Sequence, residues 1–314
     1  MNINEIKNKI LSYFNGLLFD ESSHTYSYKG NSFLSTTTYI SKFSDKFDPY
    51  FPSEAKGKKN LKNNPDDRRD GLYYRTRWNL IRDEASNRGS RVHLFAECYP
   101  DFDIPSCNKE KGIIEFYEWL PDNYEVLFME LRIFDKLSYK AGTIDGVLYN
   151  KDTGKLVLID WKTNNKNLLE YYKSKKLKYD FNGLYATDLN KYSIQLSDYK
   201  YMIEKCTDFE VEEMWIIWLT NFNINELTMG RSGDYNIDNV EPFMDTSNYK
   251  IFKLEDYSNI ISYHVEKDLK YIKSKSKKTK FKFRNTEKVT FTKKKSKNKS
   301  LTSKIKKAKN NENK

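Results

Sequence analysis

The alternation of apolar and polar positions is clearest between residues 141 and 163, where it predicts two β-strands. Apolar residues cluster at 144–148 and fill 156–159, and the NKDTG sequence that separates them is typical of a tight turn. Apolar residues spaced by three and four positions predict helices elsewhere, at 3–14, 72–99, 112–120, 191–205 and 255–272. Strand patterns complete the prediction, with a hairpin over 19–33 and single strands at 125–134 and 214–220.

Two acids interrupt the central hairpin, Asp145 in its first strand and Asp160 at the end of its second. Because residues i and i+2 of a strand point to the same face, Lys162 projects together with Asp160, and the hairpin brings Asp145 beside them. Charges that converge at a buried strand end are costly unless they bind something. A divalent metal ion together with a phosphate group would satisfy two carboxylates and one ammonium.

Two segments lack a clear apolar period. Residues 44–70 contain three prolines and many charges, and this composition predicts a mobile loop. Residues 164–190 form a polar insertion in which Lys and Tyr interleave. That pattern suits contact with a nucleic-acid backbone and its bases, and it equally suits a solvated helix. The predicted buried face of the helix at 72–99 consists of Trp78, Ile81, Ala85, Val92 and Phe95 with Ala96.

Hydroxyl and imidazole side chains add further candidates. The STTT run at 35–38 precedes a helix-like segment, where hydroxyls commonly cap the helix or, less often, hold a phosphate at its positive end. His93 lies on a predicted helix with Glu97 one turn later. A single helical histidine is usually exposed or hydrogen-bonded, but the acids downstream raise the alternative of a metal ligand. His264 lies beside an apolar stripe and is predicted to pack.

Charge is concentrated at one end of the chain. The 314 residues carry a net charge of +11, and residues 273–314 hold 18 Lys/Arg and 2 acids, a net of +16. The remaining residues, 1–272, therefore have a net charge of −5, from +11 minus +16. Such a segment either binds a polyanion non-specifically or reflects a bias in composition, and the two interpretations weigh equally. KFKF and VTFT within it predict a weak hairpin.

Cysteine content and hydropathy narrow the class of protein. Three cysteines are an odd number, which argues against a disulfide framework, and they are too few for a four-cysteine iron–sulfur cluster. No segment is long and apolar enough to span a membrane, and no signal peptide is recognisable. We expect a cytoplasmic protein, in the host cytoplasm if it is viral.

The order of these residues matches a known signature. Asp145 followed by the DWK sequence at 160–162 has the pattern D…(D/E)xK, which alone is common by chance. A GxxxH sequence at 89–93 precedes it and a QxxxY sequence at 195–199 follows it. The full set resembles the RecB-like branch of the PD-(D/E)xK nuclease superfamily. GTID and IDWKT resemble phage-encoded exonucleases and the mitochondrial genome maintenance exonuclease, and STTT resembles the SVTT segment of that group.

The resemblance covers residues 19 to 220 and implies an α/β (α+β) fold with a restriction-endonuclease-like core. That core is a central mixed β-sheet flanked by helices, with an N-terminal hairpin and helical extension and a basic C-terminal tail. The implied organisation is one nuclease domain over 1–272, followed by a flexible Lys-rich tail over 273–314. Within the domain, the hairpin and helices occupy 1–120 and the catalytic core occupies 121–272.

Site residues follow from the resemblance. It implies metal ligands at His93, Asp145, Asp160 and the backbone carbonyl of Trp161. It implies catalytic residues at Asp145, Asp160, Lys162 and Gln195. It implies DNA-binding residues at Gln195, Tyr199, Ser35 and Thr37. Lys162 would orient or activate the attacking water and balance the charge of the phosphate. Glu97 and Glu130 lie where a supporting acid could stand, but a surface or structural carboxylate is the favoured interpretation of both.

The expected function is hydrolysis of DNA phosphodiester bonds with Mg²⁺ or Mn²⁺, without an iron–sulfur cluster. Oxygen ligands suit Mg²⁺, and a histidine ligand makes Mn²⁺ equally suitable. The resemblance favours an exonuclease that acts on DNA ends or single strands in phage or viral replication, recombination, repair or processing. The alternatives are a structure-specific endonuclease and an inactive nuclease fold that binds DNA or belongs to a virion. No membrane partner is expected.

Overall fold

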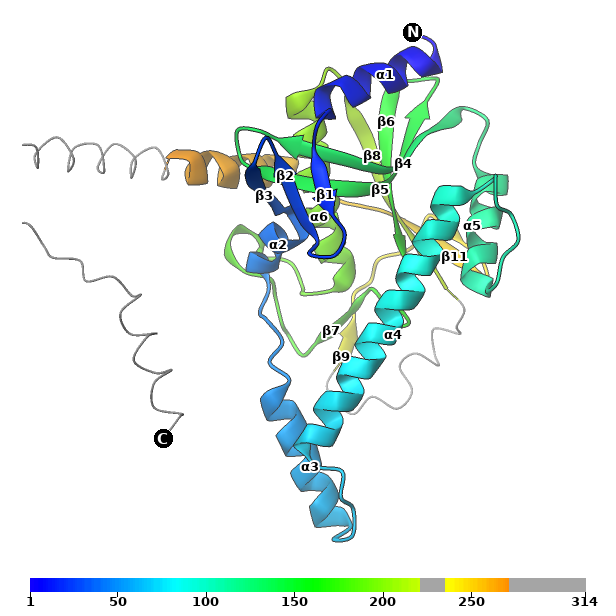
Figure 1. Cartoon of the computed structure of the whole chain (residues 1–314). Coiled ribbons are helices and arrows are strands. Elements are labelled where there is room, and N and C mark those ends of the chain that lie inside the picture. The colour runs from blue at the N-terminus through cyan, green and yellow to red at the C-terminus, as the bar shows by residue number, and fades with distance from the viewer. Residues whose placement is uncertain (221–234, 271–314) are drawn as a thin grey trace, which may run out of the picture. The chain divides into compact units, whose positions relative to one another are not determined.

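A mixed β-sheet lies at the centre of the protein, with helices packed against it (Figure 1). The computed structural model describes residues 1–220 and 235–270, and Met1–Glu266 makes up one compact unit. The helices are α1 (Ile3–Phe14), α2 (Thr36–Ile40), α3 (Tyr50–Asn63), α4 (Gly71–Cys98), α5 (Asn108–Trp119) and α6 (Asp188–Cys206), with a further helical stretch at 258–270. The strands are β1 (Leu18–Asp20), β2 (Thr25–Tyr28), β3 (Asn31–Ser35), β4 (Tyr124–Asp135), β5 (Lys140–Asn150), β6 (Lys155–Lys162), β7 (Glu170–Tyr172), β8 (Val211–Leu219), β9 (Tyr235–Ile237), β10 (Met244–Asp245) and β11 (Tyr249–Lys253).

Strand order explains how the sheet builds its central feature. The strands follow one another in the order β1-β2-β3-β5-β6-β8-β11-β10, while β4 pairs with β5 outside this path. The β3–β5 and β6–β8 pairs are parallel and the other pairs of the sheet are antiparallel. Because β4 runs along one whole edge of β5, strands β3 and β6 must share the opposite edge.

Two hydrophobic clusters pack against the sheet. One combines residues of α1 and α6 with the strands, and the other combines residues of α4 and α5 with them. In β6, Leu156 and Leu158 belong to the first cluster, whereas Val157 and Ile159 belong to the second. The continuous apolar run at 156–159 therefore arises because both sides of this strand are covered. The fold is α+β, with a mixed central sheet flanked by helices, as expected from the sequence.

The local signals in the sequence are confirmed at several elements. Helix α1 has the predicted bounds and begins with a capping box, in which Asn2 and Glu5 exchange two hydrogen bonds of 2.9 Å. Both predicted hairpins form, as β2–β3 and β5–β6. Gly30 and Gly154 have φ values of +77° and +72° in their turns, which a glycine adopts without strain.

The prediction of a loop over 44–70 is wrong, because residues Tyr50–Asn63 form helix α3. This helix lacks an apolar stripe, and its buried residues are Ser53 and Gly57. It packs instead through these small residues against the start of α4, and this tertiary contact overrides the local signals. Pro52 stands in the first turn of α3, where its missing N–H costs nothing.

The predicted helix over 72–99 is confirmed as α4, but its predicted buried face is only half right. Val92 and Phe95 are buried, whereas Ala85 is exposed and 51% of the Ile81 surface remains accessible. Trp78 is half-buried. The reason is that only the C-terminal part of this 28-residue helix lies against the sheet, so the rest of its apolar positions have nothing to pack on.

Some predictions fall outside the described residues. The Lys-rich segment 273–314, with its predicted hairpin, lies there, as do the last two residues of the helix predicted at 255–272. His264 packs as predicted, between the rings of Phe43 and Phe181, and its Nε2 lies 2.8 Å from Asp180. Within residues 1–220 and 235–270, none of the helices has the length and hydropathy needed to cross a bilayer.

Candidate active site and metal centre

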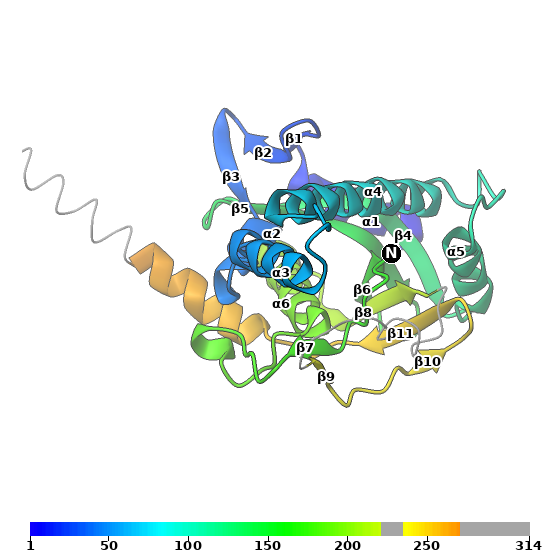
Figure 2. The same cartoon turned by 90° about the horizontal axis from the view of Figure 1, so that it is seen from below.

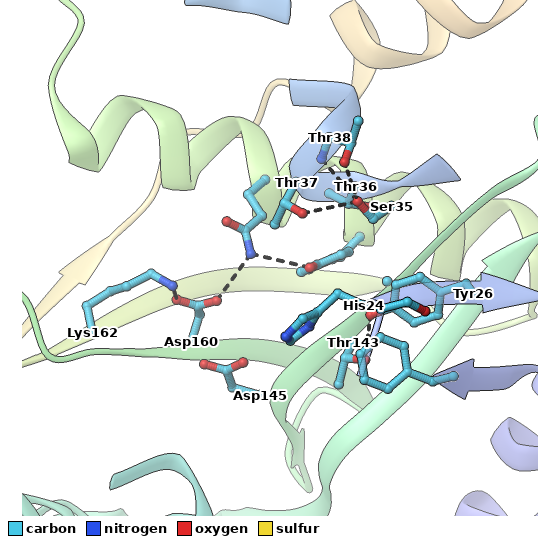
Figure 3. A pocket seen from close by; sticks show the side chains of 15 residues that line it. His24, Tyr26, Ser35, Thr36, Thr37, Thr38, Thr143, Asp145, Asp160 and Lys162 are labelled. Atoms are coloured by element: carbon cyan, nitrogen blue, oxygen red, sulfur yellow. Dashed lines mark hydrogen bonds and ion pairs between the residues drawn. The ribbon is translucent and has the colours of Figure 1, made fainter. Parts of the chain in front are cut away.

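The candidate site occupies a gap along one edge of β5. Strand β3 pairs with the start of this edge, at Lys140 and Ala141, and β6 pairs with it from Gly146 onward. Among the described strands none pairs with residues 142–145 on that edge. A pocket of about 480 Å³ opens there, and it is lined from the β1–β2 hairpin, α2, β5, β6 and α6 (Figure 3). The topology of the sheet thus creates the pocket.

Strands β5 and β6 separate where the two acids stand. Their ladder ends at the Gly146–Ile159 pair, and the backbone N–H of Trp161 donates to Oδ2 of Asp145 over 2.9 Å instead. Asp145 and Asp160 are both buried and line the same pocket. The prediction that the hairpin brings these two carboxylates together is therefore supported by their positions.

A third acid, Glu130 on β4, stands opposite Asp145. Met129 pairs with Gly146 and Leu131 pairs with Ile144, so the residue between them faces Asp145 across the two antiparallel strands. Like charges in that arrangement destabilise a sheet. Glu130 also has a φ of +54°, a left-handed backbone that a glutamate in a strand rarely adopts. Repulsion and backbone strain together mark a position that a bound cation would stabilise.

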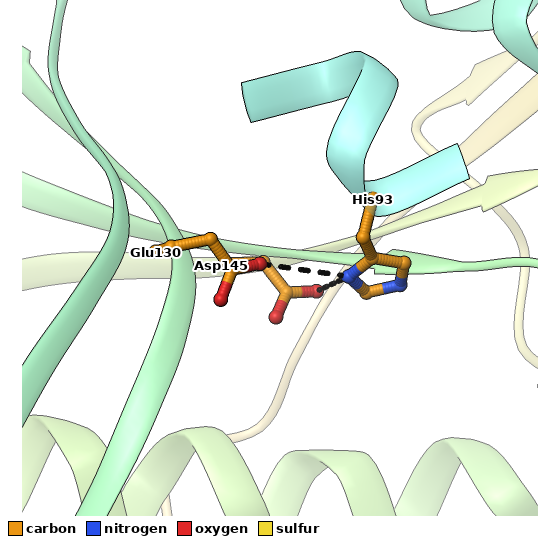
Figure 4. Close-up of side chains that lie close together, drawn as sticks. All are labelled: His93, Glu130 and Asp145. Carbon is orange, nitrogen blue, oxygen red and sulfur yellow. Dashed lines mark ion pairs between the residues drawn. The ribbon is translucent and has the colours of Figure 1, made fainter. Parts of the chain in front are cut away.

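His93 reaches this pair of acids from helix α4 (Figure 4). Its Nδ1 lies 3.3 Å from Oδ2 of Asp145 and 3.8 Å from Oε1 of Glu130. One potential ligand atom from each of the three residues lies within 4.8 Å of the others. Helix α4 approaches closely because of Gly89, where an added Cβ would lie 3.3 Å from Oγ1 of Thr163. The glycine of the GxxxH sequence thus lets the histidine reach the site.

Burial and charge shift the pKa values in this group. Burial disfavours protonation of His93, but the charge of Asp145 and a hydrogen bond with Glu130 outweigh it, so the pKa of His93 is raised. Burial raises the pKa of Asp145, and the charge of Glu130 adds to that effect. Asp145 therefore retains its proton more readily than a free carboxyl group. A divalent cation bound here would displace those protons.

Asp160 and Lys162 form an ion pair on the same side of β6 (Figure 3). Burial, followed by the charge of Asp145, raises the pKa of Asp160 to about 6. Burial alone would lower the pKa of Lys162, but the charge of Asp160 raises it above its ordinary value. The Lys162 ammonium also lies 4.3 Å from the centre of the Tyr192 ring. Lys162 is therefore protonated at neutral pH.

Helix α6 supplies the two residues of the QxxxY sequence. Nε2 of Gln195 donates to Oδ1 of Asp160 over 3.5 Å and to the Tyr199 hydroxyl over 3.3 Å. Tyr199 is buried, and burial raises the pKa of its hydroxyl. Its ring packs on Gly142, where an added Cβ would lie only 2.4 Å from Cε1 of the ring. Gln195 thus contacts Asp160, and Tyr199 contacts Gln195, whereas the predicted roles of both residues in binding DNA stay predictions.

The hydroxyls of the STTT run both cap α2 and line the pocket. Oγ of Ser35 accepts a hydrogen bond from the Thr38 backbone N–H at 3.2 Å, so the capping interpretation is confirmed. Ser35, Thr37 and Thr38 also face the pocket (Figure 3). The buried Thr36 donates to Asp198 over 2.9 Å, and this contact fixes α2 against α6. The contact of Ser35 and Thr37 with DNA stays a prediction.

The structure places other candidates less decisively. Asp160 lines the pocket and pairs with Lys162, and it stands outside the group of three ligand atoms. The Trp161 ring is buried against Phe116, and a ligand role for its carbonyl stays a prediction. Glu97 is exposed, in agreement with a surface carboxylate. Glu130 was not expected to be a ligand candidate, since its position depends on strand register rather than on a local motif.

The three grouped residues suit a divalent cation in their chemistry. Two carboxylates and one imidazole nitrogen form a donor set that Mn²⁺ accepts readily and Mg²⁺ accepts through its oxygen ligands. The opposed acids on β4 and β5 supply the negative charge that such an ion would neutralise. Comparison of the sequence with models of protein families and with curated proteins finds no match.

Proposed function

We propose that this protein is a metal-dependent nuclease of the PD-(D/E)xK type that hydrolyses phosphodiester bonds in DNA. The observation that carries the proposal is the gap in the sheet beside β5. One pocket is lined by the carboxylates of Asp145 on β5 and Asp160 on β6 and by the ammonium of Lys162 on β6. The imidazole of His93 on α4 lies beside Asp145. The arrangement suits a reaction in which negative charge builds up on a phosphate group.

His93, Glu130 and Asp145 are the residues that would hold the cation in this proposal, and Asp160 adds a third carboxylate nearby. When bound, the ion supplies positive charge beside the phosphate. Asp145 is oriented for this role by the backbone N–H of Trp161, which fixes one carboxylate oxygen at 2.9 Å.

Lys162 provides charge rather than proton abstraction in this scheme. Because the charge of Asp160 keeps its pKa above the ordinary value, the side chain is an ammonium at neutral pH. An ammonium stabilises the negative charge that develops on the phosphate as its bond to the leaving oxygen breaks. Gln195 holds Asp160 by a hydrogen bond and thereby fixes the acid against which Lys162 is oriented.

The hydroxyl side of the pocket suits the backbone of the substrate. Ser35, Thr37 and Thr38 line the end of the pocket that lies on α2, and Thr143 adds a hydroxyl from β5. Hydroxyl groups are common partners of phosphate oxygens and carry no base preference. We therefore propose that this side binds the phosphodiester backbone next to the bond that is cleaved.

Cleavage of labelled DNA with and without Mg²⁺ or Mn²⁺ tests the proposal. Asp145→Asn and Lys162→Ala should each lower the rate at least about 100-fold, because each removes charge that acts on the transition state. Asp152→Asn is the matched control, since Asp152 lies in the exposed turn between β5 and β6 and should keep wild-type activity. Wild-type cleavage rates in both active-site variants would refute the assignment.

Circular and end-labelled linear DNA, compared in the same assay, separate the two modes of cleavage. We propose an exonuclease, for which only the linear substrate should be degraded. Cleavage of closed circles would instead identify an endonuclease. Binding without cleavage of either substrate, at saturating metal, would favour an inactive nuclease fold that acts as a DNA-binding protein.

A further inference from the structure

A helical arm formed by α3 and the first part of α4 projects away from the sheet (Figure 1), and the view from below shows the two helices side by side (Figure 2). We define the arm as residues 50–88, from the start of α3 to the residue before Gly89. Its two helices pack antiparallel to each other, and neither belongs over this range to the hydrophobic clusters of the sheet. The proposed catalytic scheme gives the arm no role.

The arm is rigidly built. An added Cβ at Gly57 would lie 2.7 Å from the backbone N of Gly71, so the two helices touch at these glycines. Arg75 donates to Oγ of Ser53 over 2.8 Å and to Glu54 over 2.6 Å, which ties α4 to α3. A hairpin of helices held at both backbone and side chains presents its outer surface in a defined position.

Charge on the arm is opposite to that of the rest of the domain. Residues 50–88 contain 10 Lys/Arg and 6 Asp/Glu, a net charge of +4. Since residues 1–272 have a net charge of −5, the part outside the arm carries −9. Within residues 1–272, an acidic body would repel a polyanion, so the positive arm is the part of this range that would attract a nucleic acid.

Three exposed lysines carry positive charge on the arm that is not paired with an acid of the described residues. Most acids of the arm pair with arginines, as in Arg75–Glu54 and Arg69–Asp67. In contrast, Lys58, Lys59 and Lys62 of α3 are exposed, and no carboxylate among the described residues pairs with them. Their ammonium groups remain open to phosphates.

Aromatic rings and aliphatic side chains lie exposed among these charges. Phe51 keeps 72% of its surface accessible, Tyr50 keeps 53% and Tyr73 keeps 40%. Exposed large apolar side chains in such density mark an interaction surface on a soluble protein. Aromatic rings interleaved with lysines are the combination that stacks unpaired bases while it neutralises their phosphates.

One helix connects the arm to the candidate site. Helix α4 runs without interruption from Gly71 in the arm to Cys98, and it carries His93 between them. The 18 residues from Arg75 to His93 span about 27 Å at the rise of an α-helix. A strand bound along the arm is therefore held at a fixed distance from the ligand group.

We infer that the arm is a binding surface for single-stranded DNA that leads to the active-site pocket. The inference rests on the proposed nuclease function, because it identifies an unpaired strand as the substrate. Stacking on Phe51 and Tyr73 requires bases that are free of a partner strand, which distinguishes this surface from one that only attracts a duplex.

Binding of a fluorescent single-stranded oligonucleotide to the full chain tests the inference. Anisotropy is measured in EDTA over a series of salt concentrations for wild type and for a triple variant, Lys58→Ala with Lys59→Ala and Lys62→Ala. For single strands the slope of log K against log salt is about −0.7 for each phosphate neutralised, so the triple variant should lose about 2 units of slope. Phe51→Ala should weaken binding about tenfold at high salt, where stacking dominates.

A matched triple variant controls for loss of charge alone. Lys111→Ala, Lys136→Ala and Lys151→Ala remove three exposed lysines outside the arm, and the slope should stay as in wild type. Equal slopes for the arm variant and wild type would overturn the inference. Sedimentation that shows wild-type dimers, with Phe51→Ala monomeric and DNA binding unchanged, would overturn it too and assign the arm to self-association.

Binding and cleavage are measured separately, so failure of the proposed single-strand surface can be told from failure of the proposed nuclease function. Binding in EDTA requires no catalysis, so it reports on the arm even for a protein that does not cleave. Absence of cleavage by wild type in Mg²⁺ and Mn²⁺ would refute the proposed nuclease, while an unchanged salt slope in the arm variant would refute only the single-strand surface.

Discussion

Competition between protons and a divalent cation gives a quantitative test of the candidate metal centre. Asp160 has a pKa of about 6, raised by burial and then by the charge of Asp145. A cation held by Asp145 favours the ionised form of Asp160, so protonation of Asp160 must oppose cation binding. Lowering the pH from 7.5 to 5.0 should therefore weaken the binding of Mn²⁺ at the candidate metal centre.

The size of the effect follows from the pKa. At pH 7.5 about 3% of Asp160 is protonated, whereas at pH 5.0 about 90% is protonated. If only the ionised form accepts the cation, the apparent affinity for Mn²⁺ falls about tenfold across this range. The raised pKa values of His93 and Asp145 act in the same direction, because both must release a proton before binding. Tenfold is thus the decrease expected from full dependence on ionised Asp160, and protonation of His93 and Asp145 would add to it.

Isothermal titration calorimetry with MnCl₂ at the two pH values measures this decrease. Asp160→Asn should bind Mn²⁺ with a shallower pH dependence, because the group with a pKa of about 6 is gone. The exposed-turn variant Asp152→Asn should behave as wild type. Equal affinity of wild type at pH 5.0 and pH 7.5 would refute the reasoning, since it would mean that the cation does not depend on these carboxylates.

The same pKa predicts how the metal-free protein responds to pH. Since Asp160 has a higher pKa in the folded state than its ordinary value of 3.8, its contribution to stability is fully present below pH 3.8. That contribution is lost as the pH rises through about 6, and it amounts to about 3 kcal/mol. Urea unfolding in EDTA should therefore show added stability from this group at pH 5.0 over pH 7.5, and Asp160→Asn should show less of the difference.

Two further changes test the packing of Tyr199 and the role of residues 273–314. Gly142→Ala places a methyl group 2.4 Å from the buried ring of Tyr199 and should lower the free energy of unfolding in urea by about 1–3 kcal/mol. Gly183→Ala, whose added methyl group meets nothing within 4 Å, should lower it by less than about 1 kcal/mol, and equal losses would contradict the close packing of Tyr199. Deletion of residues 273–314, which carry a net charge of +16, should flatten the salt dependence of DNA binding and leave cleavage in place. Loss of cleavage by a folded truncated protein would show that the segment does more than attract DNA.

The central hairpin could be predicted because its information is local. The side chains of Asp160 and Lys162 share a face through the period of a strand, and the NKDTG turn fixes which residues of the two strands meet. His93 and Gln195 required the resemblance, because nothing in the helical pattern around either residue points to the hairpin. The structure brings each of them to an acid, over 3.3 Å for His93 and 3.5 Å for Gln195.

Helix α3 of the arm could not be predicted, because it is stabilised by close contact with α4 rather than by an apolar stripe. Ser53 and Gly57 are small, and their small side chains allow α3 to pack closely against α4 at Gly71. The exposed apolar residues of α4, such as Ile81, imitate the pattern of a buried face. A pattern of apolar residues indicates that a surface is to be covered, and it does not say whether the protein itself or a ligand covers it.

Glu130 shows why part of the candidate metal centre lies beyond sequence patterns. The pairing of β4 with β5 begins in one register, with Val126 opposite Leu148, and a bulge before Phe128 shifts it by one residue. Without that shift, Glu130 would stand opposite Ile144. With it, Glu130 faces Asp145, because a shift of one residue exchanges the two faces of a strand. Bulges depend on contacts along the whole ladder, so only the assembled sheet reveals the third candidate ligand, and the candidate metal centre depends on that register.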